Sequence, residues 1–165
     1  MRLFIAIKLN DAMRRAVAAV QDGFRRQGVK GNYTPVENLH LTLAFIGEYP
    51  DAREVLEVLD SVKLEPFTFE LDGVGAFGDL WWIGLSRCEA LEAYVARLRR
   101  ALAEAGIPFD RKRFSPHITL VRRASGIGRD TAAARPPKAS MAVRHVALMR
   151  SDRGRSGMIY TEIDS

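Results

Sequence analysis

The sequence contains a single cysteine, Cys88, among 165 residues. One thiol cannot form a disulfide within the chain, and it cannot supply the paired thiolates of a cysteine zinc site. No apolar run approaches the length that spans a bilayer, and the short apolar run at the N-terminus lacks the cleavage site of a signal peptide. These absences predict a cytoplasmic protein that does not insert into a membrane.

Histidine is also scarce, with only His40, His117 and His145 in the chain. Zinc normally takes three or four protein ligands, and no third ligand lies near His40 or His117 in the sequence. His145 falls in a predicted strand, where we expect a surface or structural role. The sequence therefore predicts neither a bound metal nor another cofactor.

The composition is that of a globular protein, with 47% hydrophobic and 27% charged residues. A chain of this length fits one domain, or two small lobes that share a core. The formal net charge of +5 favours an anionic partner such as RNA or a nucleotide, although small arginine-rich proteins are often basic without such a partner. Charge alone therefore decides little about function.

Two apolar segments each carry a histidine followed two residues later by a threonine: His40 with Thr42, and His117 with Thr119. Each segment has the composition of a β-strand, in which residues i and i+2 point to the same face. The leucine and isoleucine residues between them then point to the opposite face, toward a core. A lone strand histidine is usually a core residue, but two copies with the same threonine companion predict a functional site.

The elements that precede the two motifs recur in the same order. Before the first motif we expect a strand over 2–9, then a helix that Asn10 or Asp11 caps and Gly28 ends. Before the second motif we expect a strand over 80–85, then a helix that ends at Gly106. The spacing from strand to motif is nearly equal in the two copies, which predicts an internal duplication of about eighty residues.

Further local signals complete the expected elements. Ser86 followed by Glu89 is a capping-box pattern for the start of the second long helix. The remaining expectations are a short helix that begins near Asp51, a strand pair over 67–71 and 74–77, a loop over 122–138, and strands over 139–149 and 158–163.

Together these patterns predict an α+β fold of two pseudo-symmetric lobes, with mainly antiparallel sheets lining a central cleft and helices packed outside. We expect one bilobal domain over 1–165, with approximate halves 1–78 and 79–165. The matched spacing of His40 and His117 predicts that both histidines face this cleft.

Two imidazoles across a cleft provide an acid and a base near neutral pH. Threonine hydroxyls beside them can donate hydrogen bonds to a bound oxyanion. A phosphodiester suits this arrangement, because in-line displacement at phosphorus needs a base on one side and an acid on the other. Arg122 lies five residues after His117 and can add positive charge at the phosphate if the end of the strand bends toward the cleft.

The sequence resembles the two-histidine phosphoesterase superfamily, and within it the RNA 2′,3′-cyclic phosphodiesterase family, historically called 2′-5′ RNA ligases. The resemblance runs along the whole chain. The matching segments are the Arg2-Leu3-Phe4-Ile5-Ala6 opening, the two motif segments 37–48 and 114–122, a Gly73–Phe77 turn, and Trp82-Ile83-Gly84-Leu85.

The resemblance implies metal-independent hydrolysis of RNA 2′,3′-cyclic phosphate ends to 2′-phosphomonoesters, with reversible 2′-5′ RNA ligation as the same step in reverse. It implies that His40 is the proton donor to the leaving 3′ oxygen and His117 the proton acceptor that activates water. Thr42, Thr119 and Arg122 match the positions that hold the phosphate. We expect a monomer whose partner is an RNA or oligonucleotide with a cyclic phosphate end, or a nucleotide.

Candidate base-stacking residues are Tyr33, Phe45, Phe77 and Phe114, and Tyr33 stands where members of the family often carry a tryptophan. The cations Arg97, Arg99 and Arg100 are expected on the solvent-exposed face of a helix. Those just before the second motif, Arg111, Lys112 and Arg113, are better placed to steer an RNA backbone.

Two other interpretations remain open. One is a different phosphodiesterase on the same scaffold, such as a 3′ exonuclease or a 2′-5′ oligoadenylate phosphodiesterase. The other is a module that binds RNA or nucleotides without catalysis, which the two intact motifs disfavour.

Overall fold

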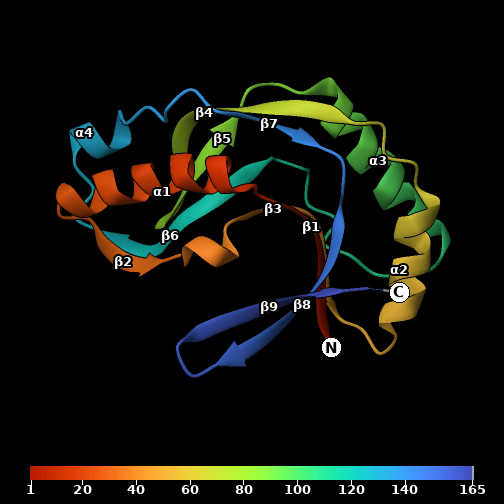
Figure 1. The fold of residues 1–165 in the computed structure, drawn as a ribbon. Helices are drawn as coiled ribbons and strands as arrows, with labels where there is room; N and C mark the ends of the chain where they lie inside the picture. The colour runs from red at the N-terminus through yellow and green to blue at the C-terminus, as the bar shows by residue number, and fades with distance from the viewer. Residues whose placement is uncertain (165) are drawn as a thin grey trace.

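The structure, a computed structural model, describes residues 1–164 and confirms the predicted α+β class (Figure 1). The elements in chain order are β1 (Arg2–Lys8), α1 (Asp11–Arg26), β2 (Lys30–Tyr33), a 3₁₀ helix η1 (Val36–Asn38), β3 (His40–Glu48), α2 (Ala52–Ser61), β4 (Phe67–Phe77), β5 (Leu80–Leu85), α3 (Glu89–Glu104), β6 (His117–Ser125), α4 (Arg129–Ala132), β7 (Ser140–Val143), β8 (Ala147–Gly154) and β9 (Gly157–Ile163).

The strands form two antiparallel sheets. The first has the order β3-β1-β8-β9 and the second has the order β2-β6-β5-β4-β7. Helix α1 packs on β6, whereas α3 packs on β3 and β4 beside α2, so the helices cover the outside of the sheets (Figure 1). The β8–β9 hairpin projects from the rest of the molecule (Figure 1). The predicted arrangement of sheets with outer helices is therefore present.

The two sheets do not coincide with the two halves of the sequence. The first sheet combines β1 and β3 from the first half with β8 and β9 from the second, and the second sheet likewise takes β2 and β4 from the first half. The boundary near residue 78 therefore divides strands within both sheets and does not run between the sheets. Antiparallel neighbours are hydrogen-bonded along their length, so each sheet needs strands from both halves to be complete.

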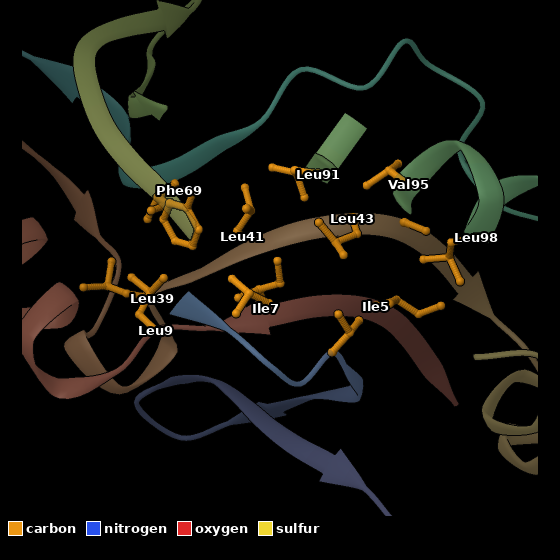
Figure 2. Packing of buried hydrophobic residues seen from close by; sticks show 14 of the residues in the cluster. Ile5, Ile7, Leu9, Leu39, Leu41, Leu43, Phe69, Leu91, Val95 and Leu98 are labelled. Atoms are coloured by element: carbon orange, nitrogen blue, oxygen red, sulfur yellow. The ribbon is translucent and has the colours of Figure 1, made fainter. Parts of the chain in front are cut away.

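The motif strands alternate as predicted. Leu41 and Leu43 on β3 and Ile118 and Leu120 on β6 have no exposed surface. They belong to one continuous cluster of buried side chains that draws on both sheets and on α1, α2 and α3. Figure 2 shows the part of this core in which β1 and β3 face the leucine and valine side chains of α3. Burial of the intervening side chains leaves the histidines and threonines on the other face.

Some local predictions were wrong. Helix α3 begins at Glu89 with Cys88 at its N-cap and no capping side chain, so Ser86 does not start it. The first long helix begins as expected, because the Asn10 side chain accepts a hydrogen bond from the Met13 N–H at 2.8 Å. A capping-box pattern shows only that a helix can begin at that position, and the second long helix begins three residues after Ser86.

The expected strand pair over 67–71 and 74–77 is instead one strand, β4, and the Gly73–Phe77 segment is part of it rather than a turn. Its first part pairs with β7 and its second part pairs with β5, with a shift of register between Leu71 and Val74. A single strand can change partner at such an irregularity. The glycine and aspartate residues that resemble a turn lie at this point.

The C-terminal third also differs from the prediction. The strand expected over 139–149 is two strands, β7 and β8, which belong to different sheets. The expected loop over 122–138 contains the end of β6 and the short helix α4. No helix among residues 1–164 is long and apolar enough to cross a membrane.

Candidate active site

The two motif strands place equivalent side chains on one surface. His40 and Thr42 lie on β3, and His117 and Thr119 lie on β6; all four are half-buried. The strands contact each other although they belong to different sheets. The tertiary structure thus brings the two copies of the motif together at the junction of the sheets.

A β-bulge follows each motif and changes which face the later residues occupy. On β6, Thr119 pairs with Trp82 but Val121 pairs with Trp81, so one extra residue is inserted and Leu120 and Val121 are both buried. Simple alternation from His117 would have pointed Arg122 into the core. The bulge instead turns the Arg122 side chain to the histidine face, as bulges commonly re-aim side chains.

The same irregularity occurs on β3, where Thr42 pairs with Ala6 and Ala44 pairs with Ile5. Leu43 and Ala44 are consecutive buried residues, and Phe45 returns to the histidine face. Phe45 and Arg122 are therefore equivalent residues of the two repeats. The two matching positions carry one aromatic ring and one guanidinium.

A helix side chain binds the carbonyl group at each bulge. The Arg99 guanidinium on α3 donates to the Leu43 carbonyl at 3.1 and 3.3 Å, and the Gln21 amide on α1 donates to the Leu120 carbonyl at 3.0 Å. Gln21 and Arg99 stand at the same distance from the starts of their helices, Asp11 and Glu89. Both satisfy a carbonyl of the bulge residue.

The role of Arg99 contradicts the prediction that it lies on a solvent-exposed helix face. Arg99 also donates to the Lys112 carbonyl at 2.7 Å, and its guanidinium lies over the rings of Phe109 and Phe114. It thereby holds the segment before His117 against the free edge of β3. A polar residue at a helix position where the apolar spacing predicts burial is the sequence signal for a side chain that binds a neighbouring carbonyl. Gln21, which is 1% exposed, is the second example.

Backbone carbonyls orient both imidazole rings. His40 Nδ1 lies 2.7 Å from the Asn38 carbonyl oxygen, and His117 Nδ1 lies 2.7 Å from the Ser115 carbonyl oxygen. A carbonyl only accepts, so Nδ1 carries the hydrogen in both rings. Nε2 is then the nitrogen that exchanges a proton, and in His40 it accepts from the Thr42 hydroxyl at 2.8 Å.

Aromatic side chains surround each histidine. Phe4 and Tyr160 pack on His40, with ring centroids 5.0 and 5.4 Å from the imidazole. Phe77 packs edge-on to His117 at 5.1 Å, and Trp82 lies beside it at 6.2 Å. These contacts restrict the rotation of both imidazoles.

Close packing of the Trp82 indole depends on a glycine in the neighbouring strand. A Cβ atom at Gly75 would lie 2.4 Å from the Trp82 ring. Any larger residue at this position would displace the indole that packs beside His117.

The site contains two adjoining cavities of about 630 and 640 Å³. His40 and Tyr160 line the first, whereas His117, Thr119 and Phe114 line the second. Both cavities are lined by Thr42, Phe45 and Arg122. The shared boundary is thus a hydroxyl, an aromatic ring and a guanidinium, with one histidine on either side.

Burial lowers the pKa of His40 below its usual value of 6.5, and the Asn38 carbonyl opposes this shift by stabilising the protonated ring. The positive charge of Arg122, and that of His117 when its ring is protonated, lowers the pKa of His40 further. His40, Arg122 and His117 are therefore close enough for the charge of one to change the pKa of another. An anion bound between them would act in the opposite direction and favour the protonated ring.

The predicted stacking residues do not all lie at the site. Phe45 and Phe114 line the cavities, as does Phe77. Tyr33 lines neither cavity: its hydroxyl donates to the Val29 carbonyl at 2.8 Å, and Arg25 lies over its ring at 4.1 Å. The structure gives Tyr33 a packing role at the edge of the second sheet instead.

Of the predicted RNA-steering cations and the third histidine, some line a cavity and others do not. Lys112 and Arg113 line the second cavity, but Arg111 does not and lies over the Phe109 ring. His145 pairs with Glu162 at 2.7 Å, away from both cavities. Within residues 1–164, no group of three or more His, Cys, Asp or Glu side chains is arranged to hold a metal ion.

Comparison with known proteins agrees with this geometry. The family model described as the 2′-5′ RNA ligase superfamily matches residues 9–155. The RNA 2′,3′-cyclic phosphodiesterase of Thermus thermophilus is 32% identical, over 99% of this chain and 88% of that protein. The RNA 2′,3′-cyclic phosphodiesterase of Methanothermobacter thermautotrophicus is 28% identical, over 99% of this chain and 96% of that protein.

The crystal structure of E. coli LigT in apo form superposes with a TM-score of 0.85 at 29% identity, and covers 99% of this chain and 94% of that chain. LigT has also been solved in complex with 3′-AMP. The similarity extends over the whole two-sheet architecture and therefore includes both motif strands.

Proposed function

Since this chain belongs to the 2′-5′ RNA ligase superfamily, we propose that it hydrolyses the 2′,3′-cyclic phosphate ends of RNA or oligonucleotides to 2′-phosphomonoesters. The observation that carries the proposal is the pair of imidazoles on duplicated strands, one in each of two cavities that share Arg122. A displacement at phosphorus needs a proton acceptor and a proton donor on opposite sides of the reacting atom.

In the proposed reaction, His117 Nε2 takes a proton from water as the water oxygen attacks phosphorus. The bond from phosphorus to the 3′ oxygen breaks, and protonated His40 Nε2 supplies the proton that this oxygen needs. Thr42, Thr119 and Arg122 donate to the non-bridging oxygens, where negative charge accumulates. The carbonyls of Asn38 and Ser115 keep both rings in the tautomer that this exchange requires.

The lowered pKa of His40 has a role in this scheme. A neutral His40 cannot donate, so the ring must gain a proton when the substrate binds. The phosphodiester anion supplies negative charge that offsets the positive charge of Arg122 and favours the protonated form of His40. Substrate binding would thereby favour the protonated form of His40 that donates the proton.

Reversible 2′-5′ ligation is the same step in reverse, with a 5′-hydroxyl in place of water. Both histidines come from one chain, so a monomer would carry a complete site. An RNA substrate favours the cytoplasm as its location, and the proposed chemistry uses neither a metal nor another cofactor.

Product analysis tests the proposal. An oligonucleotide that ends in a 2′,3′-cyclic phosphate, incubated with the protein in EDTA, should yield the 2′-phosphomonoester at the rate seen without chelator. A 3′-phosphate as product would reverse the assignment of the leaving oxygen. Loss of activity in EDTA that added metal restores would contradict the two-histidine mechanism.

A further inference from the structure

The histidine face of the first sheet continues past the active site to the β8–β9 hairpin. Residues that pair directly across antiparallel strands point to the same face. Phe4 pairs with Phe45 and with Met149, and Arg2 pairs with Ser151. Ser151 pairs with Tyr160 in turn. Arg2 therefore lies on the same surface as Phe4 and His40.

This surface combines a partly exposed aromatic platform with two cations. Phe45 and Tyr160 are half-exposed and rest on a small buried cluster of Phe4, Ala6, Ala147 and Met149, separate from the main core. Arg2 and Arg153 are exposed and line the same cavity as His40. Aromatic platforms beside cations are the usual means of binding single-stranded nucleic acid.

The carboxylates of this surface are already paired with other groups. Glu48 lies 3.3 Å from the N-terminal ammonium group, and Asp152 accepts from Arg150 at 2.9 Å. Arg2 contacts the Phe45 ring, and within residues 1–164 neither Arg2 nor Arg153 forms an ion pair. Their charges therefore remain available to an anion.

The proposed mechanism sets which way an RNA strand leaves the site. The 3′ oxygen departs on the His40 side, so the ribose that carries it lies in the His40 cavity rather than in the His117 cavity. The strand 5′ to this ribose must continue from there. Along β1, Arg2 lies four residues from Ala6, the partner of Thr42, or about 13 Å at ~3.3 Å per residue. At that distance, Arg2 lies beyond the terminal nucleotide and beside the part of the strand that precedes it.

We propose that the histidine face of the first sheet, from Phe45 and Tyr160 to Arg2 and Arg153, binds the RNA strand that precedes the cyclic phosphate. The aromatic pair contacts the terminal nucleoside, and the two arginines contact backbone phosphates upstream of it. This inference rests on the proposed function and identifies its substrate as an oligonucleotide end rather than a free cyclic nucleotide. It also directs the strand away from Lys112 and Arg113, which line the His117 cavity.

Substrate length provides the test. We would measure kcat/KM for a nucleoside 2′,3′-cyclic phosphate and for a hexanucleotide with the same end. The double variant R2Q/R153Q should lower kcat/KM for the hexanucleotide roughly tenfold and leave the mononucleotide within twofold. Loss of two phosphate contacts should also reduce the slope of log kcat/KM against log salt by about 1.4 for the hexanucleotide, at ~0.7 per phosphate of single-stranded nucleic acid.

Two control variants accompany R2Q/R153Q, and each of them also removes two positive charges. R15Q/R100Q removes two exposed arginines from the outer helices and should leave both substrates near wild type. K112Q/R113Q removes two of the cations that line the His117 cavity and should affect the two substrates equally. A hexanucleotide defect in K112Q/R113Q alone, or equal defects for both substrates in R2Q/R153Q, would overturn the inference. Failure of the wild-type protein to hydrolyse either substrate would instead overturn the proposed function.

Discussion

Each catalytic histidine depends on a contact with the backbone just before its own strand. The Asn38 and Ser115 carbonyls hold Nδ1 of the two histidines, each two residues before its ring. Asn38 is itself held, because its buried side-chain amide donates to the Met158 carbonyl of β9 at 2.9 Å. The orientation of His40 is therefore connected to the β8–β9 hairpin.

Substitution of either motif histidine should remove turnover and preserve binding. We expect H40A and H117A each to lower kcat by about 10²–10⁴-fold, the usual contribution of a general acid or base. Affinity for RNA should change only severalfold, since the phosphate and base contacts remain. H145A is the matched control and should keep wild-type kcat, because His145 pairs with Glu162 outside both cavities. Near-normal turnover in H40A or H117A would refute the acid-base assignment.

Removal of the Arg122 charge should raise the pKa of His40. Arg122 is one of the positive groups that lower this pKa, so in R122Q the ring should take up its proton at higher pH than in wild type. An NMR titration of the His40 Cε1–H signal measures this directly. In R123Q, the control, the midpoint should stay closer to wild type.

The same R122Q variant should lose about ten- to hundredfold in kcat/KM, because a hydrogen bond to a charged group contributes about 1.5–3 kcal/mol. An unchanged His40 titration together with reduced activity would mean that Arg122 acts on the substrate alone.

At the scale of elements, the two helices support the bulges of the motif strands in a crossed arrangement. Helix α1 precedes the first motif but binds the bulge of the second, through Gln21 and Leu120. Helix α3 precedes the second motif but binds the bulge of the first, through Arg99 and Leu43. Each repeat therefore helps to shape the catalytic strand of the other.

Loss of the hydrogen bonds from Arg99 to the Leu43 and Lys112 carbonyls should destabilise the protein and increase the mobility of the segment over 108–116. R99Q leaves the Leu43 and Lys112 carbonyls without this donor, so we expect the free energy of unfolding to fall by about 1–3 kcal/mol. Urea denaturation measures the stability, and hydrogen exchange at the amide of Asp110, which donates to the Phe45 carbonyl, measures the local effect.

R100Q, which changes an exposed arginine on the same helix, should alter stability by less than about 0.5 kcal/mol. Equal effects of R99Q and R100Q, or unchanged exchange at Asp110 in R99Q, would show that the guanidinium does not hold the segment.

At the scale of the whole molecule, the exchange of strands between repeats should make unfolding a single event. Strand β2 pairs only with β6, and β1 loses β8 if the chain is cut between the repeats. We therefore expect fragments 1–78 and 79–165 each to lack the chemical-shift dispersion of a folded protein. The intact chain should show coincident transitions by fluorescence and circular dichroism. A folded fragment, or two resolved transitions, would show that the repeats are independent domains.

Three features could be predicted from the order of residues alone: the repeated motif, the period-two burial of Leu41 and Ile118 opposite the histidines, and the α+β class. These features depend on alternation and composition within a few residues, which are local properties. The local capping pattern at Ser86 was misleading, because the helix begins at Glu89 with Cys88 at its N-cap, and the aromatic pattern did not indicate that the Tyr33 hydroxyl donates to the Val29 carbonyl.

Three other features depend on how the elements pack and could not be predicted: the bulges that turn Phe45 and Arg122 toward the site, the exchange of strands between the repeats, and the hydrogen bonds of Arg99 to Leu43 and Lys112. A bulge forms where a strand and its partner differ by one residue in register, and that difference exists only once the two strands are paired. The pairing of β8 with β1 and the contact of Arg99 with Leu43 likewise join residues far apart in the chain. Contacts at such separation leave no periodic signal, because they depend on the packing of elements and not on the order of neighbouring residues.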